Sequence, residues 1–139
     1  IVASGYINND NDPMTGTALY NIDSNQDVLT LQNPPNAGGQ TVVGSLGVDV
    51  AALAGLDIYT MGTNNTAYGA FQMAGNTGSG FYTVNLMTGA ATSLGFIGGN
   101  QSSDALAIRD LAVNPVPEPA TLAVLAIGAA FVARRKKKA

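Results

Sequence analysis

The last twenty residues divide this chain into two parts with different folding requirements. Residues 120–133 carry a single polar side chain, Thr121, and five consecutive cations follow at 134–138. As a helix rising about 1.5 Å per residue, this segment spans roughly 21 Å, less than the about 30 Å of a bilayer's hydrocarbon core. A buried helix is rarely followed by five uncompensated charges, whereas Arg134 and Arg135 can reach the headgroups and extend the span. The pattern predicts a transmembrane helix at 120–133 and leaves residues 1–115 to fold outside the bilayer.

Two prolines precede this apolar segment and hold the chain extended. Pro117 and Pro119 lack a backbone donor, and each disfavours helix in the residue before it. Because Lys and Arg are retained on the cytoplasmic side, the basic tail at 134–138 predicts that residues 1 to about 118 lie outside the inner membrane. An extended segment carrying the charge of Glu118 then stands at the outer membrane face, where a processing enzyme can bind it as a strand.

Pro117-Glu118-Pro119, the short apolar segment and the terminal Arg/Lys cluster resemble the PEP-CTERM sorting signal of Gram-negative bacterial surface proteins. In that family the tail is recognised by exosortase, a membrane-embedded cysteine transpeptidase-like enzyme. The resemblance covers residues 116–139. It implies that Pro117, Glu118 and Pro119 form the recognition motif, 120–133 the transient anchor and 134–138 the stop signal. An ordinary tail anchor with incidental prolines is the alternative.

The charge of the chain is split between its two parts. Residues 1–119 carry all nine acidic residues and one base, Arg109, for a net charge of −8, and the tail carries +5. A region so short of cations repels phosphate backbones, which argues against a nucleic-acid partner. The chain also has no Cys and no His, so it lacks disulfides and the commonest general base and metal ligand.

The same composition argues against catalysis. A Ser or Thr nucleophile would have no His or Lys outside the tail to activate it. No spacing of the aspartates singles out a carboxylate pair for glycoside hydrolysis. We therefore expect no enzyme, no catalytic residues, no cofactor and no metal.

Residues 1–115 consist of short alternating segments separated by turn residues, without a sustained helical period. We expect a single helical turn at 48–54, ended by Gly55. The expected strands are 2–7, 17–22, 28–32, 41–46, 56–60, 66–73, 81–86, 91–97 and 106–113.

Two phrases of the sequence recur. Leu-Tyr-Asn-Ile-Asp at 19–23 matches Phe-Tyr-Thr-Val-Asn at 81–85, and Leu-Ala-Gly-Leu-Asp-Ile at 53–58 matches Leu-Ala-Ile-Arg-Asp-Leu at 106–111. A unit of about 50–60 residues with four strands is typical of β-propellers. We therefore predict an all-β fold, a fragment of a β-propeller-like array of four-stranded antiparallel blades. Residues 56–97 would be one complete blade, flanked by two partial ones.

These phrases, with Val-Gly-Ser-Leu-Gly at 43–47 and the Thr-Gly of residues 88–89, resemble an uncharacterised propeller-like domain family of bacterial surface proteins. The resemblance covers about residues 5–113, fits the C-terminal part of that domain, and implies a fold and no activity. The chain opens without an initiator Met or a signal peptide, and two blades cannot close a ring of four to eight. We therefore expect residues 1–115 to be the C-terminal part of a longer domain.

Three groups of residues are candidate sites. Residues 8–12, Asn-Asn-Asp-Asn-Asp, offer several oxygen ligands for Ca²⁺, but they lack the Gly and bidentate Glu of an EF-type loop, which favours a hairpin loop. Asp57 and Asp110 occupy equivalent positions in the repeat. They either cap backbone donors at a strand end or line a channel that binds a cation or a sugar. The tyrosines expected to pack in strands, rather than to stack on sugars, are Tyr20, Tyr59, Tyr68 and Tyr82.

Taken together, these patterns predict an exported surface or extracellular-matrix protein with a non-enzymatic structural or interaction role. The expected partners are exosortase and, as a transient anchor, the inner membrane; exopolysaccharide is a further candidate. After processing, the protein would lie at the cell surface or outside the cell. The alternative is a sugar-binding or carbohydrate-active propeller whose active residues lie in the missing N-terminal part.

Overall fold

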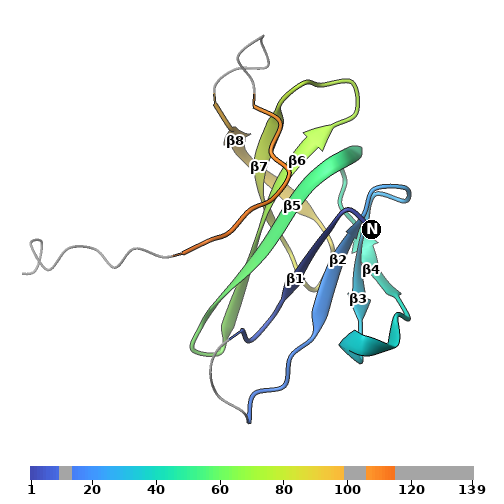
Figure 1. Ribbon diagram of the computed structural model, residues 1–139, viewed down its shortest axis with the longest axis vertical. Coiled ribbons are helices and arrows are strands. Elements are labelled where there is room, and N and C mark those ends of the chain that lie inside the picture. Colours follow the sequence, from blue (N-terminus) through green and yellow to red (C-terminus); the bar gives the residue numbers. More distant parts are fainter. Residues whose placement is uncertain (10–13, 99–105, 115–139) are drawn as a thin grey trace, which may run out of the picture.

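The computed structural model describes residues 1–9, 14–98 and 106–114 and has an all-β fold (Figure 1). The sorting motif at 117–119, the apolar segment at 120–133 and the basic tail lie outside these residues. Within them, no helix has the length and apolar character needed to cross a membrane. The elements are β1 (Ala3–Tyr6), β2 (Leu19–Asp23), β3 (Val28–Gln32), the 3-10 helix η1 (Pro35–Ala37), β4 (Thr41–Ser45), β5 (Val50–Met61), β6 (Asn64–Met73), β7 (Ser79–Val84) and β8 (Ala91–Phe96).

The strands form two four-stranded antiparallel sheets in which consecutive strands are neighbours. Sheet A has the order β1-β2-β3-β4, and sheet B has the order β5-β6-β7-β8. Sheet B is the complete unit expected at 56–97. Sheet A occupies the place of an expected partial unit, but it has four strands of its own. The described residues form these two sheets and no closed ring.

The helical turn expected at 48–54 is wrong, because β5 already begins at Val50. The N–H of Val50 donates to the Asp27 carboxylate at the turn between β2 and β3, at 2.8 Å. β5 then pairs with β6, with an irregularity in register between Val50 and Ala54. The Ala-rich run favours helix by propensity alone, and pairing with a distant strand overrides that preference.

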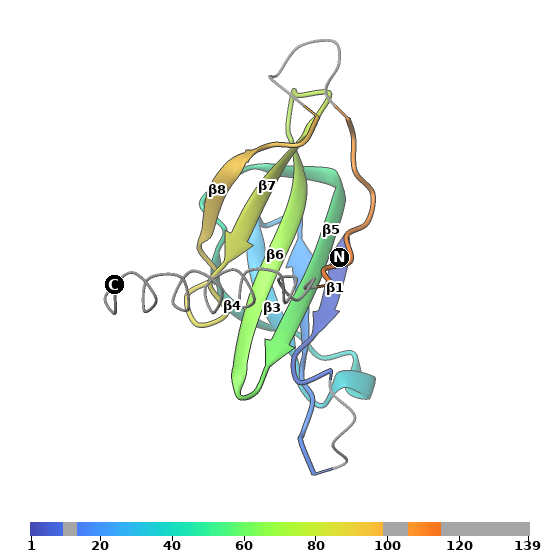
Figure 2. The same ribbon diagram turned by 90° about the vertical axis from the view of Figure 1, so that its left-hand side faces the viewer.

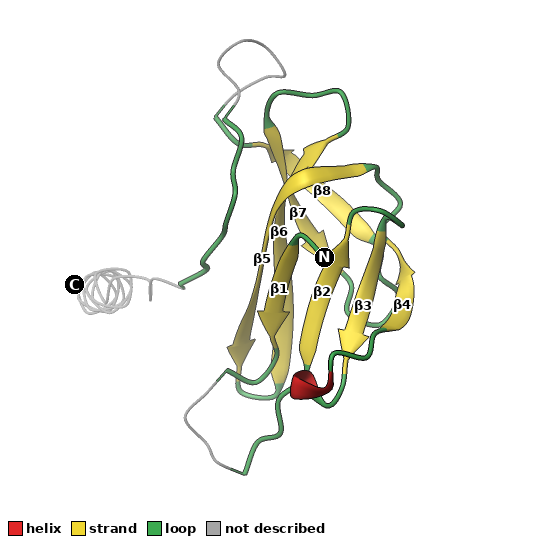
Figure 3. Cartoon of the chain, turned by 45° about the vertical axis from the view of Figure 1, so that its right-hand side comes forward, coloured by secondary structure: helices red, strands yellow, loops and turns green. Residues whose placement is uncertain are grey.

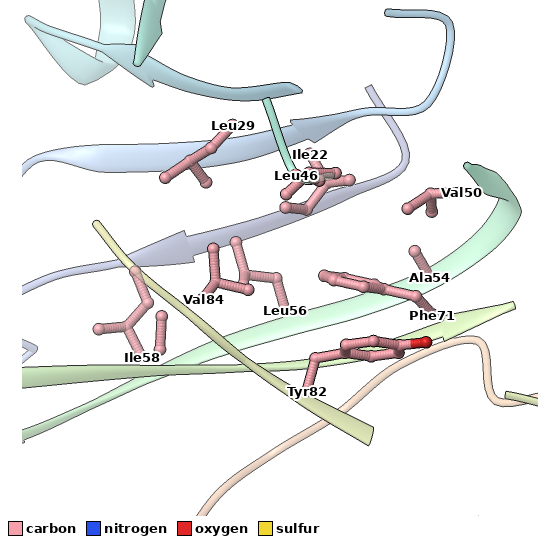
Figure 4. Packing of buried hydrophobic residues seen from close by; sticks show 11 residues of the cluster. Ile22, Leu29, Leu46, Val50, Ala54, Leu56, Ile58, Phe71, Tyr82 and Val84 are labelled. Atoms are coloured by element: carbon pink, nitrogen blue, oxygen red, sulfur yellow. The ribbon is translucent and has the colours of Figure 1, made fainter. Parts of the chain in front are cut away.

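The two sheets face each other across one hydrophobic core. Figure 2 shows sheet B in front of sheet A, and Figure 4 shows their side chains meeting between them. The rings of Phe71 and Tyr82 stack in this core with centroids 5.3 Å apart, and burial raises the pKa of Tyr82. Leu46, in the connection between the sheets, is also buried. The buried members of the core are Ile22, Leu29, Leu46, Val50, Ala54, Leu56, Ile58, Ala67, Phe71, Tyr82 and Val84.

The first repeated phrase forms the same tight turn twice. In the β2–β3 turn the Asp23 carboxylate accepts the N–H groups of Asn25 and Gln26, at 2.8 and 3.3 Å. In the β7–β8 turn the Asn85 amide oxygen accepts the corresponding N–H groups two and three residues later, at 2.8 and 3.1 Å. The hydrogen bonds to the Asp23 carboxylate, first of all that from the Asn25 N–H, lower the pKa of Asp23. Because β2 is the second strand of its sheet and β7 the third, the phrase repeats a hairpin rather than a whole blade.

Sheet A touches the β7–β8 turn at two glycines, and this contact leads to a first prediction. A Cβ on Gly44 would meet the carbonyl oxygen of Thr88, and a Cβ on Gly89 would meet the backbone of Gly44. Because both obstacles are backbone, neither can rotate away. We expect Gly44→Ala to lower the free energy of unfolding by about 1–3 kcal/mol, the usual cost of overpacking, in urea titrations of the full chain in mild detergent.

Gly39→Ala is the matched control, since nothing lies within 4 Å of a Cβ at that position. It should change the free energy of unfolding by no more than about 0.5 kcal/mol. An equal loss in both variants would show that the contact between Gly44 and the β7–β8 turn has no effect on stability.

Candidate functional site

Residues 106–114 lie in an extended conformation on the face of sheet B that points away from the core (Figures 1 and 2). The last strand expected at 106–113 is wrong, because these residues pair with no strand of the described chain. Two bonds to Ser79, at the start of β7, hold their beginning. The Ser79 N–H donates to the Leu106 carbonyl at 2.9 Å, and the Ser79 hydroxyl oxygen accepts the Ile108 N–H at 3.0 Å. We call residues 106–114 the docked segment.

The middle of the docked segment lies against the backbone of β5. A Cβ on Gly55 would lie 2.7 Å from both the Asp110 carbonyl carbon and the Leu111 nitrogen. No side chain fits in that space, so the glycine is required for this close approach. The side chains of Ile108, Leu111 and Val113 are half-buried, whereas the other members of the segment are exposed.

The end of the docked segment is bound by the carboxylate of Asp57. One oxygen accepts the N–H of Ile58 at 2.9 Å, and the other accepts the N–H of Val113 at 2.6 Å. Asp110 repeats the first half of this arrangement, since its carboxylate accepts the N–H of Leu111 at 2.8 Å. The prediction that the two aspartates bind backbone donors is confirmed, but neither lies at a strand end: Asp57 is in the middle of β5, and Asp110 is in no strand. Asp57 alone also binds an N–H far away in the sequence.

β1, β5 and the docked segment lie one after another and run in the same direction. Gly5 in β1 faces the side chains of Leu56 and Ile58, just as Gly55 in β5 faces residues 110 and 111. The contact of Asn8 with Asn65 continues the first pair toward the end of β5. The contact of Val113 with Asp57 does the same for the second pair. Figure 3 shows β1 beside β5, on the side of sheet A.

The described part of the candidate calcium loop is engaged in structural bonds. Asn8 donates its side-chain amide to the Gly16 carbonyl at 2.8 Å, and its amide oxygen accepts from Asn65 at 2.9 Å. The Asn9 amide donates to the Ile58 carbonyl at 3.3 Å. Residues 10–12 lie outside the described residues. Among the residues that the structure describes, no three carboxylate, His or Cys side chains come together in a way that could hold a metal ion.

Tyr68 and Tyr82 lie on opposite faces of sheet B, whereas Tyr20 belongs to sheet A. Tyr82 packs in the core, and Tyr68 stacks on Phe81 on the opposite face, with ring centroids 5.7 Å apart. Tyr59 and Tyr20 are half-buried. The expectation that Tyr68 and Tyr82 take part in packing is confirmed.

Sequence reasoning missed Gly55 and Ser79, the residues of sheet B against which the docked segment lies, and the bond that Val113 of the segment makes to Asp57. The repeat did mark Asp57 and Asp110 as equivalent. It gave no indication that the copy at 106–111 lies against the copy at 53–58. The predicted sorting residues Pro117, Glu118 and Pro119 follow the docked segment closely in the sequence and lie outside the described residues.

Two family models match this chain, one on each side of the end of the docked segment. The model described as domain of unknown function (DUF4394) matches residues 1–112, and the model of the PEP-CTERM protein-sorting motif matches residues 115–138. Neither the curated proteins nor the solved structures contain a significant match. Val113, whose N–H binds Asp57, lies between the two matched regions.

Proposed function

The chain belongs to the DUF4394 family, and on that premise we propose that it is a non-enzymatic surface protein whose sheet domain is delivered by its C-terminal tail. The PEP-CTERM motif implies recognition by exosortase and a membrane-anchored precursor that is processed for the cell surface. This match at residues 115–138 is the observation that carries the proposal.

The details of the tail form the finer part of the proposal. Residues 120–133 are the anchor, the cations at 134–138 stay in the cytoplasm, and the sheet domain lies outside the inner membrane. Pro117, Glu118 and Pro119 are the residues that exosortase reads. The charge pattern supports this orientation, because all five cations of the tail follow the apolar segment.

A structural or interaction role for the sheet domain is supported by the use of its carboxylates. Asp27 and Asp57 bind backbone N–H groups, and Asp23 closes a turn. In sheet A the buried Asn21 bonds to Ser4 and Gln40, in a network of uncharged side chains. The hydrogen bonds of these side chains stabilise the fold, and this use favours a structural role over proton transfer.

We also propose that the two sheets are neighbouring units of a propeller-like array. The first strands of successive blades run in the same direction around a common axis. The shared direction of β1, β5 and the docked segment supports this proposal, in which the docked segment would take the place of the first strand of a third unit.

Removing residues 120–138 tests the anchoring role of the tail. Expressed with an export signal and an N-terminal tag in a host that has exosortase, the intact chain should pass through a membrane-bound precursor. The shortened chain should bypass the membrane fraction, because no apolar segment remains to hold it. Replacing only the five cations with Gln is the control for charge, and should leave the apolar segment without its fixed orientation. A shortened chain that still sediments with the inner membrane would contradict the proposed anchor.

A further inference from the structure

We propose that Asp57 is a positioning residue for processing: by holding residues 106–114 on β5, it sets how closely the sheet domain approaches the sorting motif. The inference rests on the proposed function, since it concerns access of the same enzyme to the same tail. In the described part of the chain, the carboxylate of Asp57 binds the N–H groups of Ile58 and Val113. Its effect passes through the docked segment.

The number of residues between the last docking bond and the motif is small. The N–H of Val113 binds Asp57, and Pro117 follows four residues later. An extended chain covers at most about 3.6 Å per residue, so the motif begins within about 14 Å of the sheet. A domain of this size has a radius of gyration of about 13 Å. While the segment is docked, the length of this chain limits how far the sheet domain can stand from the residues that a membrane-embedded enzyme must enclose.

Release of the docked segment would lengthen the stretch of chain that connects the sheet domain to the sorting motif, without unfolding the sheets. The nine residues 106–114 add about 30 Å of extended chain. Leu106 is 57% exposed, and only three side chains of the segment are half-buried. A segment with few apolar contacts and no strand pairing opens at lower cost than the sheets beneath it.

The carboxylate of Asp57 is the group best placed to control this opening. It binds its own strand through one oxygen and the docked segment through the other, and bonds to a charged acceptor are stronger than neutral ones. Asp57→Asn keeps the shape of the side chain and one acceptor oxygen. Its amide nitrogen accepts no N–H, so one uncharged oxygen must serve both Ile58 and Val113, and the bond to Val113 is lost or weakened. The ratio of docked to released segment should fall about tenfold or more.

Arg109 provides a direct measurement of release. It is exposed on the docked segment and is the only Lys or Arg before residue 134, so trypsin has a single site in the sheet domain. In purified precursor, Asp57→Asn should raise the rate of cleavage after Arg109 about tenfold. Asp27→Asn is the matched control, because that carboxylate also binds a distant backbone N–H, that of Val50, on another part of the fold. It should leave the cleavage rate near that of the wild type.

Processing is then measured by pulse-chase labelling in a host that has exosortase. Asp57→Asn should be shortened several-fold faster than the wild type and Asp27→Asn. A Gly/Ser linker of about eight residues inserted after Asn114 lengthens the chain between the docked segment and the sorting motif by about 26 Å when extended. The linker should therefore speed processing of the wild type and abolish the difference between the wild type and the Asp57→Asn protein.

Two results would overturn the inference. One is an Asp57→Asn precursor that is cleaved by trypsin no faster than the wild type. The other is an Asp57→Asn precursor that trypsin cleaves faster while processing keeps the wild-type rate. Failure of the proposed function has a different signature, since a Glu118→Ala precursor would then be shortened at the rate of its parent, with or without the Asp57→Asn change.

Discussion

Phe71→Ala is expected to lower the free energy of unfolding by about 3–5 kcal/mol, the usual loss when a buried aromatic ring is removed. Phe71 is fully buried, stacks on Tyr82 and lies in the core that both sheets share. The buried side chains of the two sheets form a single cluster, so neither sheet has a core of its own that could survive the loss. Because domains are stable by only about 5–15 kcal/mol, this one change removes a large part of the total.

Urea titration of the full chain in mild detergent measures the loss of unfolding free energy, and hydrogen exchange shows which strands are destabilised. Because the core is shared, amides of β2 in sheet A should exchange faster together with those of β7 in sheet B. Met87→Ala is the control, since that side chain is 89% exposed in the β7–β8 turn, and it should change the free energy by no more than about 0.5 kcal/mol. Faster exchange confined to sheet B would mean that the sheets are stabilised independently.

The strands were predictable because their signals are local. Alternation at 28–32 and 66–73, bounded by Gly- and Asn-rich turns, indicates strands that the structure contains. The recurring phrase that ends at Asp23 and Asn85 was also visible, and in the structure each copy leads into a turn closed by that Asx side chain and by a residue with positive φ four positions later. The start of β5 was not predictable, because Val50 pairs with Met73 at the far end of the next strand.

At the candidate site, too, local features were predictable from the sequence, whereas contacts between distant residues were not. Repetition marked Asp57 and Asp110 as equivalent, and the cap that each makes to the next N–H depends only on its own position. The bond from Val113 to Asp57 and the closeness of Gly55 to residues 110 and 111 depend on how separate parts of the chain meet. A sequence pattern with a period of two residues places an extended segment, but it does not say which surface that segment will cover.

Glu118→Ala is expected to abolish processing while leaving the membrane-bound precursor intact. The substitution removes the only charge between Val116 and Pro119, in the region that matches the PEP-CTERM motif. Insertion depends on the apolar residues 120–133 and the cations at 134–138, which are unchanged. The match to the sheet domain's family ends at residue 112, so the stability of that domain should not change. Asp49→Ala is the control for the loss of one acidic residue, because Asp49 is exposed in the sheet domain before β5.

An immunoblot of membrane and culture fractions distinguishes a tail that is read and removed from one that only anchors. The protein carries an N-terminal tag and is expressed in a host with exosortase. Wild type and Asp49→Ala should yield a shortened species that leaves the inner membrane, while Glu118→Ala should accumulate there at full length. A Glu118→Ala protein shortened and released to the same extent as the wild type would contradict recognition of the motif and identify the tail as a plain anchor.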